Sequence, residues 1–330
     1  MVTRRQSIAA LALAAFPMSA FAQQSSGRIY RIGALAFRAR STPENPEVFY
    51  DAFSRGLKDL GYVDGKNILV DWRFAEGKFD RLQGLAEDLV RTKPDLIVTH
   101  STPATEALKK ATSVIPIVTS GVADPIVSGF AASLAHPGGN ITGLSAVAVD
   151  LSPKYLELLK IITPTLSRVA VLANLNNSSN SAMVKATDTA AKALKLTVLP
   201  LNASTADEID EAFAKAKRDR AGAIIVVNDS FFIWRRRQIV DLTLEYRLPS
   251  MFPFVEDTRA GGLMSYGQNL EITYYRIATY VDKILKGAKP ADLPFEQPTI
   301  FHHAINGKTA KALGLKIPHE LLLRANEIVE

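Results

Sequence analysis

The chain alternates short apolar runs with segments whose apolar residues recur at helical spacing, and this alternation constrains its fold more than any other feature. Runs rich in β-branched residues are typical of strands buried on both faces, and a strand–helix–strand order predicts a doubly wound parallel sheet. The predicted strands are 32–37, 67–74, 95–100, 115–118, 141–147, 168–173, 197–201, 223–227 and 250–254. The predicted helices are 47–60, 79–91, 152–162, 181–194, 207–218 and 234–246, with a further helical pattern after each of the strands 95–100 and 115–118.

Two such α/β series follow one another, which predicts two similar lobes joined near 147–152. A chain of 330 residues also exceeds the usual size of a single hydrophobic core. The tail departs from the simple order, with a strand and loop at 261–268, a long amphipathic helix at 270–285, a linker at 289–294 and a strand at 299–305. A tail of this kind would suit a chain that crosses between the lobes more than once, but periodicity alone does not show a crossing.

Composition excludes several classes of protein. Hydrophobic residues at 47% and charged residues at 22% are ordinary for a soluble globular chain, and the absence of cysteine excludes disulfides, thiolate nucleophiles and cysteine metal sites. Residues 1–22 place Arg4 and Arg5 before an apolar run and small residues, which predicts a cleaved secretory signal. Without their two arginines the net charge falls from +6 to +4, too little to argue for nucleic acid. The basic cluster 235–237 is interpreted as a solvated helix face.

The turn after the strand 95–100 is the first candidate for a binding site. Thr102 followed by Pro103 predicts a helix N-cap with proline at the first helical position, so a strand ends and a helix starts within a few residues. In an open parallel sheet, ligands bind outside the carboxyl ends of the strands. The hydroxyls of Ser101 and Thr102, with the free N–H groups of the helix start, are able to hold a carboxylate or phosphate. The alternative is that these hydroxyls only cap the helix.

The other strand-to-helix turns supply the remaining candidates. Serine hydroxyls and asparagine amides offer neutral hydrogen bonds, while Asp124 and Asp229 are the acids placed sharply at strand ends and would pair with an ammonium group. Each aspartate is equally suited to capping the next helix. Aromatic residues at these turns would stack on an apolar or aromatic ligand, although core packing is their commoner use. The candidate ligand-binding residues are Phe37, Ser101, Thr102, Ala104, Ser120, Asp124, Asn174, Asn176, Asn228, Asp229, Phe254 and Tyr266.

Signals of enzymatic chemistry are largely absent from the sequence. It contains no dinucleotide-binding fingerprint, P-loop, zinc-protease motif or nucleophile elbow. His302 and His303 are adjacent on a predicted strand, so they face opposite ways and do not easily share a metal. His100 is the one plausible acid or base, and a structural role is the alternative. We therefore expect no catalytic residues, no cofactor and no metal.

Several motifs together carry a family resemblance. The C-terminal part contributes 262–267, 280–294, 296–298, Asn306, 309–315 and 317–318, and the earlier part contributes 56–62, 65–67, 101–104, 122–126 and 137–143. In this order they resemble the ABC-type tryptophan/tyrosine uptake substrate-binding family over nearly the whole mature chain. The motifs are specific for the family and unspecific for the ligand.

That resemblance implies a type 1 periplasmic-binding fold, in which two Rossmann-like lobes hinged by three crossings close on one small molecule. The first lobe would be 28–146 plus 258–289, and the second 147–257 plus 290–330. The implied function is the periplasmic solute-binding component of an ABC importer, with an aromatic amino acid as the default ligand. Its partners would be an ABC permease and its ATPase, without nucleic acid, and the protein would be a monomer that performs no covalent chemistry.

Two alternatives stay open at this point. One is a secreted α/β enzyme that uses His100 with Asp124 or Asp229. The other is a ligand-sensing module that presents its closed state to a membrane receptor. A DNA-binding regulator with the same sensor fold is disfavoured, because the N-terminus predicts a signal rather than a helix-turn-helix.

Overall fold

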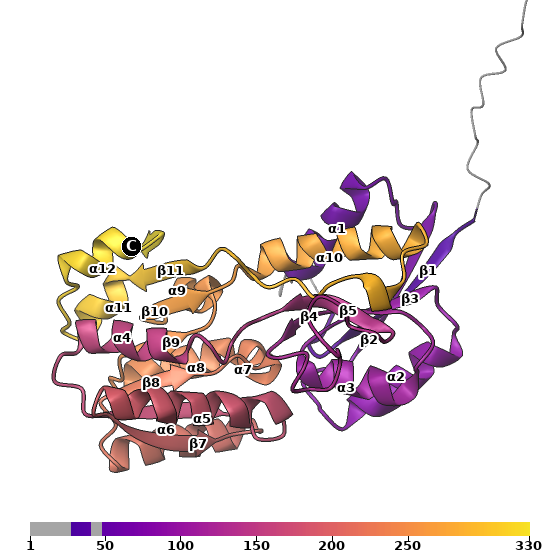
Figure 1. Ribbon diagram of the computed structural model, residues 1–330. Coiled ribbons are helices and arrows are strands. Elements are labelled where there is room, and N and C mark those ends of the chain that lie inside the picture. The colour runs from indigo at the N-terminus through magenta and orange to yellow at the C-terminus, as the bar shows by residue number, and fades with distance from the viewer. Residues whose placement is uncertain (1–27, 41–47) are drawn as a thin grey trace, which may run out of the picture.

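The computed structural model describes residues 28–40 and 48–330, which form two α/β lobes side by side (Figure 1). The first lobe is built on a five-stranded sheet of order β2-β1-β3-β4-β5, in which every strand pair is parallel. Helices α1 and α10 pack together on one face, and α2 and α3 pack on the other. The strands are β1 Tyr30–Ala36, β2 Ile68–Phe74, β3 Leu96–His100, β4 Ile117–Val122 and β5 Ile141–Ser145. The helices are α1 Val48–Asp59, α2 Arg81–Arg91, α3 Thr102–Ala111 and α10 Leu270–Leu285.

The second lobe is built on a seven-stranded sheet of order β12-β11-β10-β9-β8-β6-β7. Its strand pairs are parallel except that β11 runs antiparallel to β10, so the predicted parallel sheet is mixed toward this edge. The strands are β6 Arg168–Ala173, β7 Thr197–Asn202, β8 Ala223–Val226, β9 Ser250–Phe252, β10 Met264–Gly267, β11 His302–Asn306 and β12 Glu327–Val329. The helices are α4 Ser152–Ile162, α5 Ser178–Ala193, α6 Ala206–Arg218, α7 Ser230–Trp234, α8 Arg236–Glu245, α9 Val255–Arg259, α11 Gly307–Ala312 and α12 His319–Arg324.

The chain passes between the two lobes three times: after β5, between β10 and α10, and before β11. The second crossing falls later than the family resemblance implies, because β10 pairs with β9 and β11 and so keeps 258–267 in the second lobe. The third also falls later, because Glu296 hydrogen-bonds to Gly143 and Ser145 of the first lobe. A bidentate ion pair between Arg276 of α10 and Glu296, at 3.0 and 3.1 Å, fixes this last return.

Most predicted elements are confirmed, with α4, β6 and α10 at the predicted bounds. The helix predicted after β4 is wrong, since the chain makes turns from Asp124 to β5 and Pro125 and Pro137 interrupt any helical run. The helix predicted at 234–246 is confirmed as α8, but the short helix α7 before it is not predicted. The two are separated at Arg235, whose backbone angles are φ −95° and ψ 14°. The apolar spacing continues across this break, so the pattern does not reveal it.

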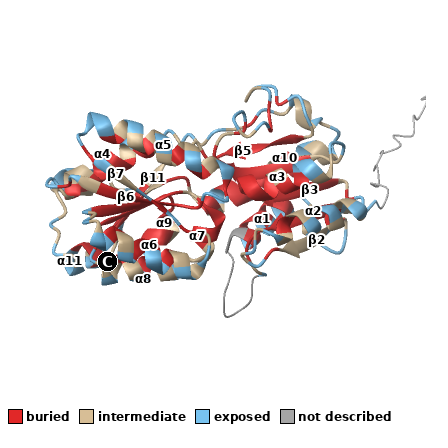
Figure 2. Cartoon of the chain, turned by 90° about the horizontal axis from the view of Figure 1, so that it is seen from below, coloured by how far each residue is buried: buried red, intermediate tan, exposed pale blue. Residues whose placement is uncertain are grey.

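Burial places the apolar faces of both sheets in the interior and the outward helix faces in solvent (Figure 2). One extended apolar cluster runs through the second lobe and the α2–α3 side of the first. A second cluster fills the space between the first sheet, α1 and α10, and it includes Ile233 and Phe254 from the second lobe. The lobes are therefore in apolar contact in this structure.

The predicted secretory signal, residues 1–22, lies outside the described residues. Within 28–40 and 48–330, no helix is both long enough and apolar enough to cross a membrane.

The close approach of β4 and β5 at Gly143 generates a test of the fold. Gly143 has φ +145°, and a Cβ placed there would lie 1.9 Å from the carbonyl oxygen of Thr119. Gly143→Ala should lower the free energy of unfolding by about 3 kcal/mol or more, since backbone must move to admit the methyl group. Gly84→Ala, in the exposed part of α2 where nothing lies within 4 Å, should instead raise it by about 0.5–1 kcal/mol. Urea denaturation of the two variants measures both effects, and equal stabilities would contradict the packing described.

Candidate functional site

The turns that follow the strands of both sheets meet where the lobes face each other. Ser230, just after β8, lines the same pocket as the ends of β1 and β3. Ser178, at the start of α5, donates from Oγ to Oε1 of Glu106 on α3 at 2.6 Å. The carboxyl ends of parallel strands lie at one edge of a sheet, so two sheets facing each other bring both sets of turns together. This is the position that the strand-end argument predicts for a binding site.

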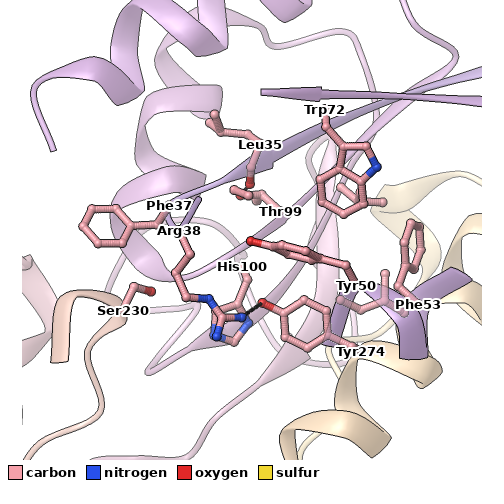
Figure 3. Close-up of a pocket in the computed structure, with 13 residues that line it drawn as sticks. Leu35, Phe37, Arg38, Tyr50, Phe53, Trp72, Thr99, His100, Ser230 and Tyr274 are labelled. Atoms are coloured by element: carbon pink, nitrogen blue, oxygen red, sulfur yellow. Dashed lines mark hydrogen bonds between the residues drawn. The ribbon is translucent and has the colours of Figure 1, made fainter. Parts of the chain in front are cut away.

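The pocket lies mainly in the first lobe, between its sheet and the helices α1 and α10 (Figure 3). Its walls are largely aromatic and aliphatic, and Ser230 is the lining residue from the second lobe. A concave apolar site with a few convergent polar groups is the usual form of a small-molecule site. The lining residues are Leu35, Ala36, Phe37, Arg38, Tyr50, Phe53, Trp72, Val98, Thr99, His100, Ser230, Tyr274 and Ile277.

A buried guanidinium stands among these rings. Arg38 is only 6% exposed, and its Nη2 donates to the hydroxyl of Tyr274 at 3.4 Å. Its Cζ lies 5.7 Å from the centre of the Tyr50 ring, a distance at which a cation is attracted to the ring face. An arginine in such surroundings attracts an anion more strongly than one in water does, because the local dielectric is low.

Aromatic rings in tilted and edge-on contact build the rest of the pocket wall. The rings of Tyr50 and Trp72 lie 4.7 Å apart, and those of Tyr50 and Tyr274 lie 6.3 Å apart. The sequence argument missed Arg38, Tyr50, Trp72 and Tyr274. Only Arg38 had a signal, since it lies in the turn directly after the first predicted strand.

His100 contributes a neutral imidazole. Its Nδ1 lies 2.9 Å from Oγ of Ser120, and its ring stacks on Tyr274 with centroids 5.1 Å apart. Burial, with a smaller contribution from the nearby Arg38 cation, lowers the pKa of His100 to about 3. Its imidazole is therefore neutral near neutral pH, which argues against an acid role, and so low a pKa also makes it a weak base. Ser120 is buried, and its hydroxyl is engaged by this histidine.

Ser101 adopts a backbone conformation that is normally reserved for glycine. Its φ of 91° and ψ of 153° fall in a region that a Cβ disfavours. The strain is held by hydrogen bonds on both sides, from Ser101 N to Ser120 O at 2.9 Å and from Thr105 Oγ1 to Ser101 O at 2.7 Å. Ser101 rather than the predicted Thr102 is the N-cap of α3, because Thr102 already has helical geometry.

The hydroxyl of Ser101 does not cap the helix. The side chain is 4% exposed, and Oγ has no hydrogen-bond partner among the described residues. A buried hydroxyl that meets no partner costs free energy, as does the backbone strain. Two unfavourable features at one strand-end turn are typical of a functional site rather than of a cap.

Asp229 is buried in a small polar network in the second lobe. Its Oδ1 accepts from the backbone N of Phe231 at 2.8 Å and from Nδ2 of Asn174 at 3.4 Å, and its Oδ2 accepts from Nδ2 of Asn177 at 2.7 Å. The carboxylate thus caps α7, as the capping alternative predicts. Burial outweighs these hydrogen bonds and raises the pKa of Asp229 to about 6.

The remaining polar candidates are more peripheral. Asp124 accepts from the backbone N–H groups of Ile126 and Val127 at 2.9 and 3.0 Å, so its carboxylate closes a turn, and no helix follows for it to cap. Asn176 is exposed, and Asn177 is the asparagine that meets Asp229. Asn228 is half-buried and accepts from Asn180 through its backbone carbonyl.

The apolar candidates separate into two groups. Phe37 lines the pocket and packs on Phe79 with ring centroids 4.5 Å apart. Phe254, the residue before α9, is buried in the apolar cluster of the first lobe. Tyr266 stacks on Phe301 in the second lobe and does not line the pocket. Thr102 and Ala104 are buried in the first turn of α3.

The basic cluster at 235–237 is only partly solvated, contrary to its interpretation from the sequence. Arg237 is exposed and pairs with Asp241 on α8. Arg236 instead donates from Nε to Oδ1 of Asp257 at 2.5 Å, and Asp257 is 4% exposed. Burial raises the pKa of Asp257, and the adjacent Arg236 opposes this rise.

Two lobes of this topology, facing each other across a pocket at their strand ends, define the fold of periplasmic binding proteins. The model of a family described as ABC transporter substrate binding protein matches residues 46–329. The chain belongs to this family, which binds solutes and is not an enzyme family.

Characterised relatives support the same assignment. A tyrosine-binding protein of Clostridioides difficile (strain R20291) is 29% identical over 265 residues, covering 80% of this chain and 76% of that protein. The ABC domain from Streptococcus pneumonia in complex with L-Trp is 26% identical, with a TM-score of 0.83 over 91% of this chain and 100% of that one. The ligand-free, open structure of a substrate-binding protein with adhesive properties from Clostridium difficile is 25% identical, with a TM-score of 0.64 over 91% of this chain and 99% of that one.

The strain at Ser101 generates the second prediction. Ser101→Gly removes both the hydroxyl and the disfavoured conformation, so its free energy of unfolding should be higher than that of Ser101→Ala by about 1 kcal/mol. Both variants should bind ligand more weakly than the wild type if the hydroxyl contacts ligand. Denaturant melts and calorimetric titration of the pair measure the two effects, and a less stable glycine variant would show that the backbone is not strained.

Proposed function

We propose that this chain is the periplasmic solute-binding component of an ABC importer and that it traps an aromatic amino acid, or a closely related compound, between its lobes. The observation that carries the proposal is the aromatic pocket at the strand ends, with Arg38 in its wall and Ser230 reaching it from the other lobe. The periplasmic location rests on the predicted signal at 1–22. The delivery step, to a membrane permease driven by its ATPase, rests on the family.

Each part of such a ligand has a chemical counterpart at the site. The ring of the ligand stacks among Tyr50, Trp72 and Tyr274, where the pocket is aromatic. Its carboxylate meets Arg38 in the pocket wall, and the hydroxyl of Ser101 follows the lining residue His100 in the chain but does not itself line the pocket. We propose that its ammonium group meets the carboxylate of Asp229, which precedes the lining residue Ser230 and does not itself line the pocket.

The relatives favour the same class of ligand. One is described as a tyrosine-binding protein, and another was solved in complex with L-Trp. Both align over most of this chain, so an aromatic amino acid is the first compound class to test.

The enzyme alternative is weaker. His100 is neutral and hydrogen-bonded to Ser120, and the carboxylate of Asp124 accepts from two backbone N–H groups of its own turn. We infer that the chain performs no covalent chemistry on its ligand and acts as a monomer. The genes beside this one separate the importer from a sensor, because a permease and its ATPase support transport and a receptor supports sensing.

A ligand screen tests the proposed function. A ligand that binds only the folded protein stabilises it by RT ln(1 + [L]/Kd), about 4 kcal/mol at a thousandfold excess over Kd. Thermal shift with the twenty amino acids and small aromatic acids should therefore give a few hits, with L-tyrosine or L-tryptophan among them. The ligand should be recovered unchanged by mass spectrometry. Consumption of the compound by substoichiometric protein would support the enzyme instead.

The pKa of Asp229 generates a pH-dependent prediction. Between about pH 4 and pH 6 the folded protein holds a proton on this carboxyl that the unfolded chain does not, since the folded pKa is raised to about 6. Its contribution should make the folded protein less stable by about 3 kcal/mol as the pH rises through that window. Binding an ammonium group requires the ionised carboxylate, so affinity should rise with pH up to about 6, and binding below it should release a proton. Calorimetry in two buffers of different ionisation enthalpy measures that proton.

Asp229→Asn is the matched variant for this measurement. The amide oxygen keeps the helix cap, but the amide nitrogen faces the Nδ2 donor of Asn177. The loss of that hydrogen bond opposes the gain from removing a buried charge, so stability at neutral pH should stay within about 1 kcal/mol of the wild type. Affinity for an amino acid should fall by about tenfold or more, because the ammonium loses its charged partner, and proton release should disappear. Unchanged affinity would remove Asp229 from the site and leave it as a cap alone.

A further inference from the structure

We propose that α7 is the closure element of the second lobe, and that Trp234 is a positioning residue which holds the lobes together without touching the ligand. The effect of Trp234 on ligand retention rests on the proposed function. The contact that Trp234 makes between the lobes does not depend on that function. Both views place α7 where the two lobes meet (Figures 1 and 2). Neither Ile233 nor Trp234 lines the aromatic pocket.

Trp234 lies directly on the backbone of the first lobe. A Cβ placed on Gly77 would be 2.9 Å from both Cδ1 and Nε1 of the indole, so only a residue without a side chain admits the ring at this distance. Gly77 follows β2, and its backbone N donates to the carbonyl of Phe37 at 2.8 Å. The indole therefore rests on a turn that is tied to the residue preceding Arg38 at the pocket.

Ile233 adds an apolar contact beside it. The side chain is 7% exposed and belongs to the apolar cluster of the first lobe, which also contains Tyr50 and Tyr274 from the pocket wall. Burying apolar surface between lobes stabilises the closed arrangement over an open one in which that surface meets water.

The short length of α7 links these contacts to the ligand. Asp229 caps the helix, Ser230 lines the pocket, and the backbone N of Ile233 donates to the carbonyl of Asp229 at 3.0 Å. The ligand-facing end and the lobe-facing end thus belong to one hydrogen-bonded turn. A ligand that engages Asp229 and Ser230 brings Ile233 and Trp234 onto the first lobe at the same time. Because the closed state binds ligand better, whatever stabilises closure raises affinity.

A second contact between the lobes provides a way to measure closure. Ser178 and Glu106 are bonded at 2.6 Å across the lobes at an exposed position, and the chain contains no cysteine. In the double variant Glu106→Cys with Ser178→Cys, a short thiol-specific cross-linker joins the lobes only when they are closed. Its reaction rate reports how much of the protein is closed, with no ligand required.

Adding Trp234→Ala to this cysteine pair should slow cross-linking by about tenfold, as expected when an aromatic anchor is removed from an interface. Trp234→Phe should have an intermediate effect, because it keeps part of the ring. The matched control is Arg237→Ala, which changes an exposed side chain on the neighbouring helix α8 and should leave the rate unchanged. An unchanged rate in Trp234→Ala would overturn the proposal, provided its far-ultraviolet circular dichroism and melting match the parent. A variant that fails to fold is replaced by Trp234→Phe, whose unchanged rate has the same force.

Titration with L-tyrosine separates this inference from the proposed function. With native Glu106 and Ser178, Trp234→Ala should bind L-tyrosine about tenfold more weakly, chiefly through faster dissociation. If the wild type binds no aromatic amino acid while cross-linking still depends on Trp234, the proposed ligand class fails and the closure element stands. If Trp234→Ala binds and cross-links like the wild type, the closure element fails and the proposed function stands.

Discussion

The carboxylate of Asp229 is the interaction on which the meeting of the two lobes depends. A helix of five residues has too few internal hydrogen bonds to be stable alone, so α7 needs its cap and its packing. Asp229 supplies the cap, and Asn174 and Asn177 fix the carboxylate from the turn after β6. Hydrogen bonds therefore hold together the turns after β6 and β8 within the second lobe, independently of any contact with the first lobe. The raised pKa records the free-energy cost of keeping this carboxylate out of water.

The first lobe carries its own unfavourable features at the corresponding place. Ser101 combines a glycine-like backbone with a hydroxyl that is buried without a partner among the described residues. Such features persist only where the surroundings enforce them, and here the β3–β4 ladder and Thr105 do so. Unfavourable features thus stand on both sides of the meeting point of the lobes, at Ser101 in the first lobe and at Asp229 in the second.

The sequence predicts this architecture well where local chemistry determines it. Helix α10 keeps its apolar period throughout and begins at a capping Asn269, so its bounds are readable from the residues alone. The site is predicted less well because it is assembled from distant segments. Tyr50, Trp72 and Tyr274 come from α1, β2 and α10, and α10 reaches the first lobe only after the chain has built most of the second. Periodicity carries no information about that return.

The residues at strand ends show a second limit of prediction. Ser101, Asp124 and Asp229 look alike in the sequence, since each stands just before a possible helix start. Only hydrogen bonding separates them. Asp124 uses its carboxylate in its own turn, Asp229 caps a helix and also joins a buried network, and Ser101 does not cap through its side chain. Local propensity is the same for all three, and only their tertiary contacts distinguish them.

The two lobes contribute unequally to the pocket wall, and under the proposed function this affects ligand selectivity. The first lobe supplies all but one of the lining residues, so the shape and the chemistry that recognise a ring belong to it. The second lobe supplies Ser230 to the wall and reaches the first lobe through α7. A compound of the wrong shape would still enter the first lobe. It would hold α7 away from the first lobe, where Trp234 contacts Gly77, and would therefore dissociate quickly. Recognition of the ring then lies in the first lobe and retention in the second, and the free energy of closure is the quantity that joins them.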